Sequence, residues 1–135
     1  MNSNYHLDTA YIAGLFDGEG SLTYKKYKEK KKSGTYNCRR ISMEISMTDQ
    51  NVIELVHETL MVGTVRPKKV PKNMKPQWRW RCTFRDCLHV CKMLWPHVIV
   101  KLHAIEKVID HYEPDIQDLG DNLIDLEMER GKRNV

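Results

Sequence analysis

Residues 11–24 read YIAGLFDGEGSLTY, and this stretch decides how the rest of the chain is interpreted. Its first part is small and apolar and predicts a helix, whereas the segment from Asp17 to Gly20 interleaves two carboxylates with two glycines. A helix that only fills a core usually ends in one glycine and a polar loop. The pattern therefore indicates that something is held at the end of this helix.

The helix itself is predicted over roughly residues 9–17, with Leu7 as a hydrophobic staple and Asp8 as the N-cap. One face of small or short side chains lets another helix approach closely. This predicted contact face consists of Ala10, Ala13, Gly14 and Asp17.

Strand patterns follow the helix. Polar and apolar residues alternate from Ser21 to Lys25 and again from Ile41 to Thr48, which predicts two half-buried strands joined by the lysine-rich turn KEKKKSGTY. The segments GTVR and QWRWRCTF predict two more strands, and in the second of these Trp78, Trp80, Cys82 and Phe84 form an apolar face opposite a cationic one.

Helices separate and follow these strand pairs. Asp49 or Asn51 is expected to cap a helix that Gly63 ends, and Asp86 to cap one that stops before Pro96. Further helices are predicted over roughly 101–112 and 115–131. The order predicts one α+β domain over residues 1–135, with a core of about 5–112 and a four-stranded antiparallel sheet.

Charge is distributed unevenly along the chain. Residues 25–40 and 66–81 contain fifteen of the 22 Lys and Arg, and residues 105–129 contain nine of the 18 Asp and Glu. A strongly positive surface opposite a negative one is typical of a protein that binds a polyanion. Charge alone leaves open the alternative of two solvated, lysine-rich loops.

The sequence also indicates the cellular compartment to expect and the state of the four cysteines. It starts without a basic region followed by an apolar run and has no apolar stretch of about 20 residues, so an intracellular protein without a membrane span is expected. The four cysteines lack the paired spacing of a zinc ribbon, and Cys87, His89 and Cys91 do not share one helix face. We expect reduced thiols and no structural zinc.

The polar faces of the four predicted strands form one surface of mixed donors and acceptors. Lys and Arg bind phosphates, while Arg, Gln, Ser, Thr and acidic side chains read base edges in the major groove. This pattern favours DNA binding over a sheet that is merely wet on one side. The candidate DNA-binding residues are Thr23, Lys25, Tyr27, Arg40, Ser42, Glu44, Ser46, Arg66, Lys68, Gln77, Arg79 and Arg81.

The segment IAGLFDGEG, residues 12–20, resembles the nine-residue signature of the LAGLIDADG homing endonucleases. The predicted order of elements is also similar to the αββαββα core of that family, over roughly residues 5–112. The resemblance implies a site-specific endonuclease that hydrolyses both strands of a long, pseudo-palindromic DNA target. It also implies that two signature helices pack side by side and bring their ends together at the floor of a DNA-binding saddle.

The resemblance further implies roles for individual residues. Glu19, where Asp is commoner, would bind the divalent metal, with Gly18 beside it; Mg²⁺ is the expected ion, and Mn²⁺ or Ca²⁺ are others that could bind. Lys101, in WPHVIVKL, would stabilise developing charge. Asp49, or Gln50 in the alternative register, would be the polar active-site residue, although Asp49 suits an N-cap equally well. Asp17 is expected to hold the helix end or the partner helix by hydrogen bonds.

A single signature in 135 residues implies half a site per chain, and hence a two-fold symmetric homodimer on double-stranded DNA. The expected source is a mobile intron, an intein or a free-standing element in a prokaryote, a phage-infected host or an organelle. The alternatives are an intron RNA maturase or a non-cleaving DNA-binding protein on the same scaffold. A third is a small α/β protein with basic loops and no nucleic-acid partner.

Overall fold

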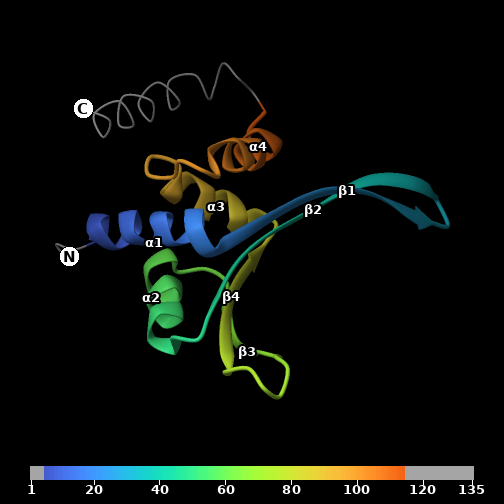
Figure 1. Ribbon diagram of the computed structural model, residues 1–135. Coiled ribbons are helices and arrows are strands. Elements are labelled where there is room, and N and C mark those ends of the chain that lie inside the picture. The colour runs from blue at the N-terminus through green and yellow to red at the C-terminus, as the bar shows by residue number, and fades with distance from the viewer. Residues whose placement is uncertain (1–4, 115–135) are drawn as a thin grey trace.

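The computed structural model describes residues 5–114, whose helices and strands alternate as the sequence predicts (Figure 1). This order confirms the α+β class and the αββαββα core, followed by one further helix. The elements are α1 (Tyr5–Glu19), β1 (Gly20–Lys31), β2 (Gly34–Met47), α2 (Gln50–Leu60), β3 (Thr64–Lys68), β4 (Gln77–Thr83), α3 (Arg85–Leu94) and α4 (Leu102–Tyr112).

The four strands form one antiparallel sheet in the order β1-β2-β4-β3. Gly20 pairs with Ile45, and Ile45 pairs with Trp80, so β1 enters the sheet directly from the end of α1. β4 pairs with residues 42–47 of β2, whereas residues 34–41 pair with residues 24–31 of β1 alone. Residues 24–41 therefore form a two-stranded extension, here called the arm, which projects from the body in Figure 1.

The core lies between the helices and one face of the sheet. Ile12 and Phe16 of α1 and Trp80 of β4 are completely buried there. The Trp80 indole N–H donates to the Val62 carbonyl at 2.9 Å, which satisfies its one polar group. Gly63 has a φ of 89°, and a Cβ there would lie 2.7 Å from Trp80 Nε1, so the chain can pass the indole ring only as glycine.

The base of the arm is attached to α4 through Tyr24. Arg39 Nε donates to the Tyr24 hydroxyl at 3.3 Å, and that hydroxyl lies 3.3 Å from His111 Nδ1. The Arg39 guanidinium carbon lies 5.9 Å from the centre of the Tyr24 ring. Outward from this contact the residues of the arm are exposed or half-exposed, and the strands are held by their mutual pairing.

Several boundaries of helices and strands differ from the predicted ones. α1 begins at Tyr5, so Asp8 lies inside the helix and is not its N-cap. The segment predicted as a lysine-rich turn is strand except for residues 32–33, because the backbone ladder continues past the end of the apolar pattern. α2 ends at Leu60, and Met61 takes the left-handed conformation (φ 67°), before the predicted Gly63.

The start of α3 also differs from the prediction. Phe84, at a φ of 51°, occupies the N-cap position, and Asp86 lies in the first turn. Because the chain turns sharply here, Phe84 leaves the apolar face of β4 and is 51% exposed. The predicted acidic helix over 115–131 lies outside the described residues. Within residues 5–114, no helix is long and apolar enough to cross a membrane.

Candidate active site and nucleic-acid interface

The end of α1 is shaped by a close contact between Phe16 and Gly20. A Cβ added at Gly20 would lie 2.3 Å from Cδ1 of the buried Phe16 ring, far inside van der Waals contact. Gly20 is therefore required for the chain to leave the helix and enter β1. At Gly14 and Gly18, by contrast, a Cβ would meet nothing within 4 Å. The packing of the chain itself does not require glycine at these two positions.

The exposed small-residue face of α1 differs in part from the predicted one. Ala13 is completely buried, because it lies one turn before Phe16 on the core side of the helix. Ala10 is half-buried, and Gly14 and Gly18, spaced at four-residue intervals after it, are exposed. Tyr11, which the sequence reading missed, is 51% exposed beside them. The accessible stripe is therefore Ala10, Gly14 and Gly18.

Asp17 fastens the segment before α4 to the end of α1. Its carboxylate accepts hydrogen bonds from the backbone N–H of Ile99 at 2.6 Å and of Lys101 at 3.1 Å. Lys101 Nζ in turn donates to the backbone carbonyl of Asp17 at 2.8 Å. Of the two roles expected for Asp17, the structure shows the first, which is to hold the helix end of its own chain.

Lys101 is thereby placed at the same end of α1 as Glu19. Its ammonium nitrogen lies 5.6 Å from the centre of the Phe16 ring, as well as against the Asp17 carbonyl. The carboxyl end of a helix carries partial negative charge and favours a cation. A half-buried, fixed positive charge therefore lies beside the turn that carries Glu19.

Glu19 is exposed, and its carboxylate has no hydrogen-bond or ion-pair partner among the described residues. Within residues 5–114 there is also no group of three or more His, Cys, Asp or Glu that could hold a metal ion. Since backbone amides occupy the Asp17 carboxylate, one chain offers one free carboxylate at this end of α1. Hard divalent cations take about six or more oxygen ligands. The Glu19 carboxylate offers oxygen ligands of the kind such an ion takes, but fewer than the ion needs.

Asp49 is the N-cap of α2, where its side chain accepts a hydrogen bond from the Val52 N–H at 3.2 Å. A capping bond of this kind contributes about 1 kcal/mol to helix stability and accounts for an acid at this position. Gln50 is the first residue of the helix and is exposed. The catalytic role of either residue stays a prediction.

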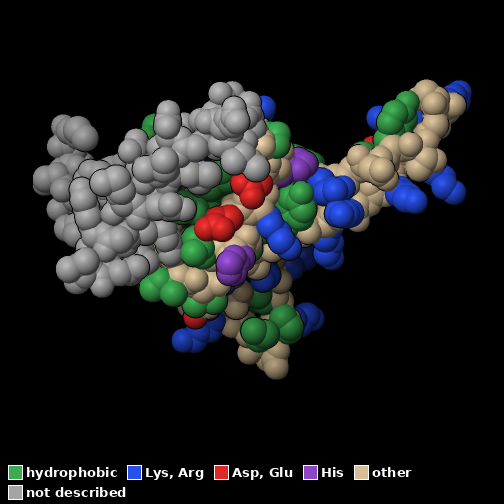
Figure 2. Space-filling model, turned by 90° about the horizontal axis from the view of Figure 1, so that it is seen from above, with side chains coloured by type: hydrophobic (Ala, Val, Ile, Leu, Met, Phe, Trp, Pro, Cys, Tyr) green, Lys and Arg blue, Asp and Glu red, His purple; other side chains and the backbone are tan. Residues whose placement is uncertain are grey.

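The polar face of the sheet is assembled as the alternation predicts. All twelve candidate DNA-binding residues share one face of the sheet in the observed register. Over the body of the sheet this face lies opposite the helices, and along the outer arm the residues on both faces are exposed or half-exposed. Figure 2 shows Lys and Arg side chains along the arm as far as its tip. Ser42, however, is only 6% exposed, and the Ser46 hydroxyl is buried without a hydrogen-bond partner in the described part of the chain. These two serines are shielded by their neighbours, so the accessible surface is made by the longer side chains.

The observed register adds three residues that are not among the twelve candidates. Ser21, Thr64 and Thr83 are exposed on the polar face, where Ser21 is paired with Glu44, and Thr64 with Arg81. All three lie within the predicted strand segments, so the alternation of those segments already places them on the polar face.

Like charges lie directly opposite each other in three cross-strand pairs. Such pairs destabilise a sheet that has no counter-ion. They are Lys25–Arg40 and Lys26–Arg39 in the arm, and Arg66–Arg79 between β3 and β4. Lys25–Arg40 and Arg66–Arg79 lie on the polar face, whereas Lys26–Arg39 lies on the opposite face of the arm. Neutralisation of the first two pairs by a bound polyanion would remove their repulsion, which favours a phosphate-binding surface over a merely solvated one.

The cysteines form no disulfide and no metal group within the described residues. Cys82 and Cys87 are buried with their sulfur atoms 3.6 Å apart, and Cys91 is buried beside Met43. The hydrogen bond with Cys87, together with burial, raises the pKa of the Cys82 thiol, and burial raises that of Cys91. The Cys82 and Cys91 thiols are therefore protonated, and all three buried cysteines pack as apolar parts of the core.

Comparison with known proteins identifies the family. The family model described as LAGLIDADG endonuclease matches residues 12–97, which is more than half of the chain. The chain therefore belongs to the LAGLIDADG endonuclease family, and its activity class is that of a site-specific DNA endonuclease. No curated protein matches the sequence.

Solved structures share the fold at low sequence identity. The homing endonuclease I-CvuI, in complex with its target in the presence of calcium, superposes with a TM-score of 0.66 at 18% identity, covering 97% of this chain and 82% of that chain. The archaeal intron-encoded homing endonuclease I-Vdi141I, complexed with DNA, superposes with a TM-score of 0.62 at 18% identity, covering 93% of this chain and 83% of that chain. I-LtrWI bound to target DNA superposes with a TM-score of 0.60 at 19% identity, and here 98% of this chain corresponds to 45% of that chain.

Proposed function

We propose that two copies of this chain form a divalent-metal-dependent endonuclease that cuts both strands of a long, two-fold symmetric DNA site. The observation that carries the proposal is the free Glu19 carboxylate, which lies at the end of α1 beside the fixed Lys101 ammonium. This end of α1 also leads directly into the cationic sheet face.

The proposed dimer is formed by packing α1 against its copy. Gly14 and Gly18 have open space around them in the single chain, so close approach of a second helix explains why they lack side chains. Ile99 and Val100 are 69% and 76% exposed next to the same helix end, and would be covered in the dimer. The match of this chain to less than half of I-LtrWI supports an arrangement in which one chain supplies half of a site.

In the dimer, two-fold symmetry brings the Glu19 side chains together. Their repulsion favours a bound cation between them. A divalent ion held by these carboxylates and the DNA phosphate would supply an activated water and stabilise the departing oxygen.

Lys101 positions positive charge for the same reaction. Its ammonium is held by the Asp17 carbonyl, so little ordering is needed when a phosphate arrives. Preorganised cations aimed at charge that develops in the transition state lower the barrier more than mobile ones. The sheet face meanwhile binds the flanking duplex, with its paired cations neutralised by phosphates.

Cleavage selection tests this proposal. The protein and its Glu19→Gln variant are incubated with a randomised duplex-DNA library and magnesium, and both broken ends and retained uncut duplexes are sequenced. Glu58, an exposed acid on α2, provides the matched control Glu58→Gln. We expect a two-fold-related motif at the broken ends for the wild type and the control. For Glu19→Gln we expect cleavage to fall by about 10³-fold, since several kcal/mol of charge stabilisation are lost, with binding retained.

Two results would contradict the proposal. Equal cleavage by Glu19→Gln would remove this carboxylate from the chemistry, and motifs only among bound, uncut duplexes would indicate DNA binding without cleavage. Sedimentation tests the assembly separately, because a monomer at micromolar concentration, with and without DNA, is incompatible with a shared site.

A further inference from the structure

Glu29 is the sole acid between residues 20 and 40, a segment that contains eight Lys and Arg. It lies near the outer end of β1, on the same face as Thr23, Lys25 and Tyr27, because these residues are separated by steps of two. Its side chain retains 45% of its exposure. An accessible carboxylate is therefore placed on the surface proposed to face DNA.

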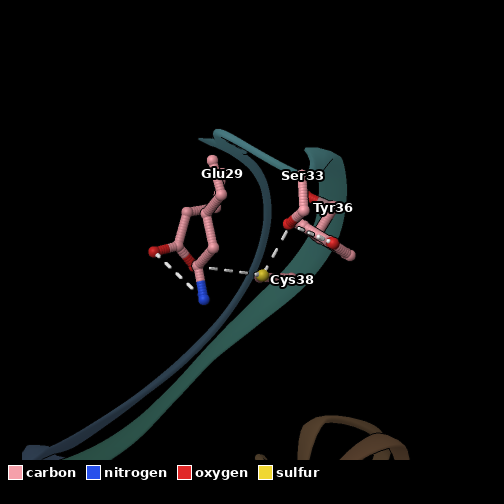
Figure 3. A network of polar contacts seen from close by, with 5 residues as sticks. Glu29, Ser33, Tyr36 and Cys38 are labelled. Carbon is pink, nitrogen blue, oxygen red and sulfur yellow. Dashed lines mark hydrogen bonds and ion pairs between the residues drawn. The ribbon is translucent and has the colours of Figure 1, made fainter.

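The carboxylate is oriented by its neighbours but not saturated by them (Figure 3). Oε2 accepts a weak hydrogen bond from Cys38 Sγ at 3.7 Å, and Oε1 lies 4.0 Å from Lys31 Nζ. Across the turn, the Ser33 and Tyr36 hydroxyls are hydrogen-bonded at 2.7 Å. An exposed ion pair at that distance contributes little to stability, so neutralising Lys31 is a weak reason for the acid.

A carboxylate facing DNA is repelled by phosphates and by every base-edge acceptor. The donors available in the major groove are the amino groups of cytosine and adenine. The adenine amino group lies beside the N7 acceptor, which repels a second carboxylate oxygen, whereas cytosine presents no acceptor there. The chemistry of Glu29 therefore fits cytosine best and disfavours guanine and thymine.

Building on the proposed endonuclease function, we propose that Glu29 reads a cytosine near the outer end of each half-site. Six residues separate Thr23 from Glu29, which is about 20 Å of strand. At 3.4 Å per base step, this cytosine lies roughly six base pairs outside the position nearest Thr23. Two-fold symmetry repeats the preference in the other half-site.

Binding selection on randomised duplex DNA, in buffer containing EDTA to prevent cleavage, tests the assignment with the full chain. The wild type is expected to enrich cytosine at one outer position of a two-fold motif. Glu29→Gln keeps the length and shape of the side chain but adds an amide donor, so the preference should move toward adenine. We expect the cytosine-to-adenine ratio to change by about tenfold at that position and nowhere else. Glu29→Ala should lose the preference altogether.

Lys25→Ala is the matched control on the same face. It should weaken retention of all sequences alike and leave the outer base preference intact, since lysine contacts phosphate. Thermal unfolding of each variant checks that the arm variants remain folded.

The outcomes separate the two proposals. A two-fold motif whose outer position is the same for wild type, Glu29→Gln and Glu29→Ala overturns the role of Glu29 and leaves the endonuclease standing. A wild-type protein that enriches no motif overturns site-specific recognition itself, and the cytosine assignment with it. A uniform loss of affinity in Glu29→Gln without a change of base would assign Glu29 to the structure of the tip.

Discussion

The two ends of β1 are built in opposite ways. At its start, the Phe16 ring presses against Gly20, and three hydrogen bonds fix Asp17 and Lys101 to each other and to Ile99. At its far end in the arm, the side chains are exposed or half-exposed, and the strands are held by mutual pairing. At the first end, packing and hydrogen bonds hold the side chains in place. At the second end, the charged side chains have few contacts that would hold them.

This difference matches the two tasks of a DNA endonuclease. Chemistry needs reacting groups held within a fraction of an ångström, which a helix end packed against a buried ring provides. Reading a long duplex needs reach and hydrogen-bonding side chains in the groove, and a two-stranded ribbon can enter the major groove. The rigid body thus carries Glu19 and Lys101, while the arm carries Glu29 and eight of the Lys and Arg.

Thiol reactivity gives the largest expected contrast between body and arm. Cys38, half-exposed in the arm, should be alkylated by iodoacetamide in the native protein at least about 10³-fold faster than the three buried cysteines of the body, which react only after local unfolding. The raised pKa of the Cys82 and Cys91 thiols acts in the same direction, because the thiolate is the reactive form.

Mass spectrometry over time measures this contrast, with urea-unfolded protein as the control in which all four thiols react. Rapid native labelling of Cys87 or Cys91 would show that the body opens as readily as the arm.

Gly20→Ala tests how tightly the helix end is fixed. The new methyl group overlaps the buried Phe16 ring, so the free energy of unfolding should fall by about 1–3 kcal/mol, measured by urea denaturation. Gly18→Ala is the matched control: its Cβ enters open space, and alanine is the better helix former by about 1 kcal/mol, so the single chain should not be destabilised.

Protein concentration distinguishes a further effect at Gly18. A loss of stability for Gly18→Ala that grows with dilution would locate Gly18 in the dimer contact. Equal, concentration-independent losses for both variants would contradict the special constraint at Gly20.

The sequence was sufficient for the order of elements and for the face on which each strand residue lies. Both depend on local periodicity, and the twelve candidate residues share one face because alternation survives folding. The end of the strand pattern was misjudged in the arm, where lysines replace apolar residues although the backbone pairing continues to Lys31. Periodicity of hydrophobic residues cannot detect a strand that has no buried face.

Contacts between distant segments were the other limit. The pattern placed Asp17 at a helix end. It did not predict the hydrogen bonds of Asp17 to Ile99 and Lys101, because these residues lie more than 80 positions away in the sequence. Ala13 was misassigned because an alanine fits either a helix contact or a core, and only its position one turn before Phe16 decides between them. Phe84 left its predicted face because a positive φ turned the chain, and nothing in the local sequence signals that turn.

Arg66→Ala sharpens the comparison at the other edge of the sheet, where the smallest effect is expected. Arg66 on edge strand β3 faces Arg79, so its removal should raise the free energy of unfolding by roughly 0.5 kcal/mol through loss of like-charge repulsion. The same change removes one phosphate contact, so the negative slope of log affinity against log salt for duplex DNA should become less steep by about one. Stability and DNA affinity therefore move in opposite directions. Lys107 is exposed on α4, on the helix side of the sheet, so the control Lys107→Ala should change neither the free energy of unfolding nor the DNA affinity. If Arg66→Ala lowered both the free energy of unfolding and the DNA affinity, Arg66 would be a structural residue.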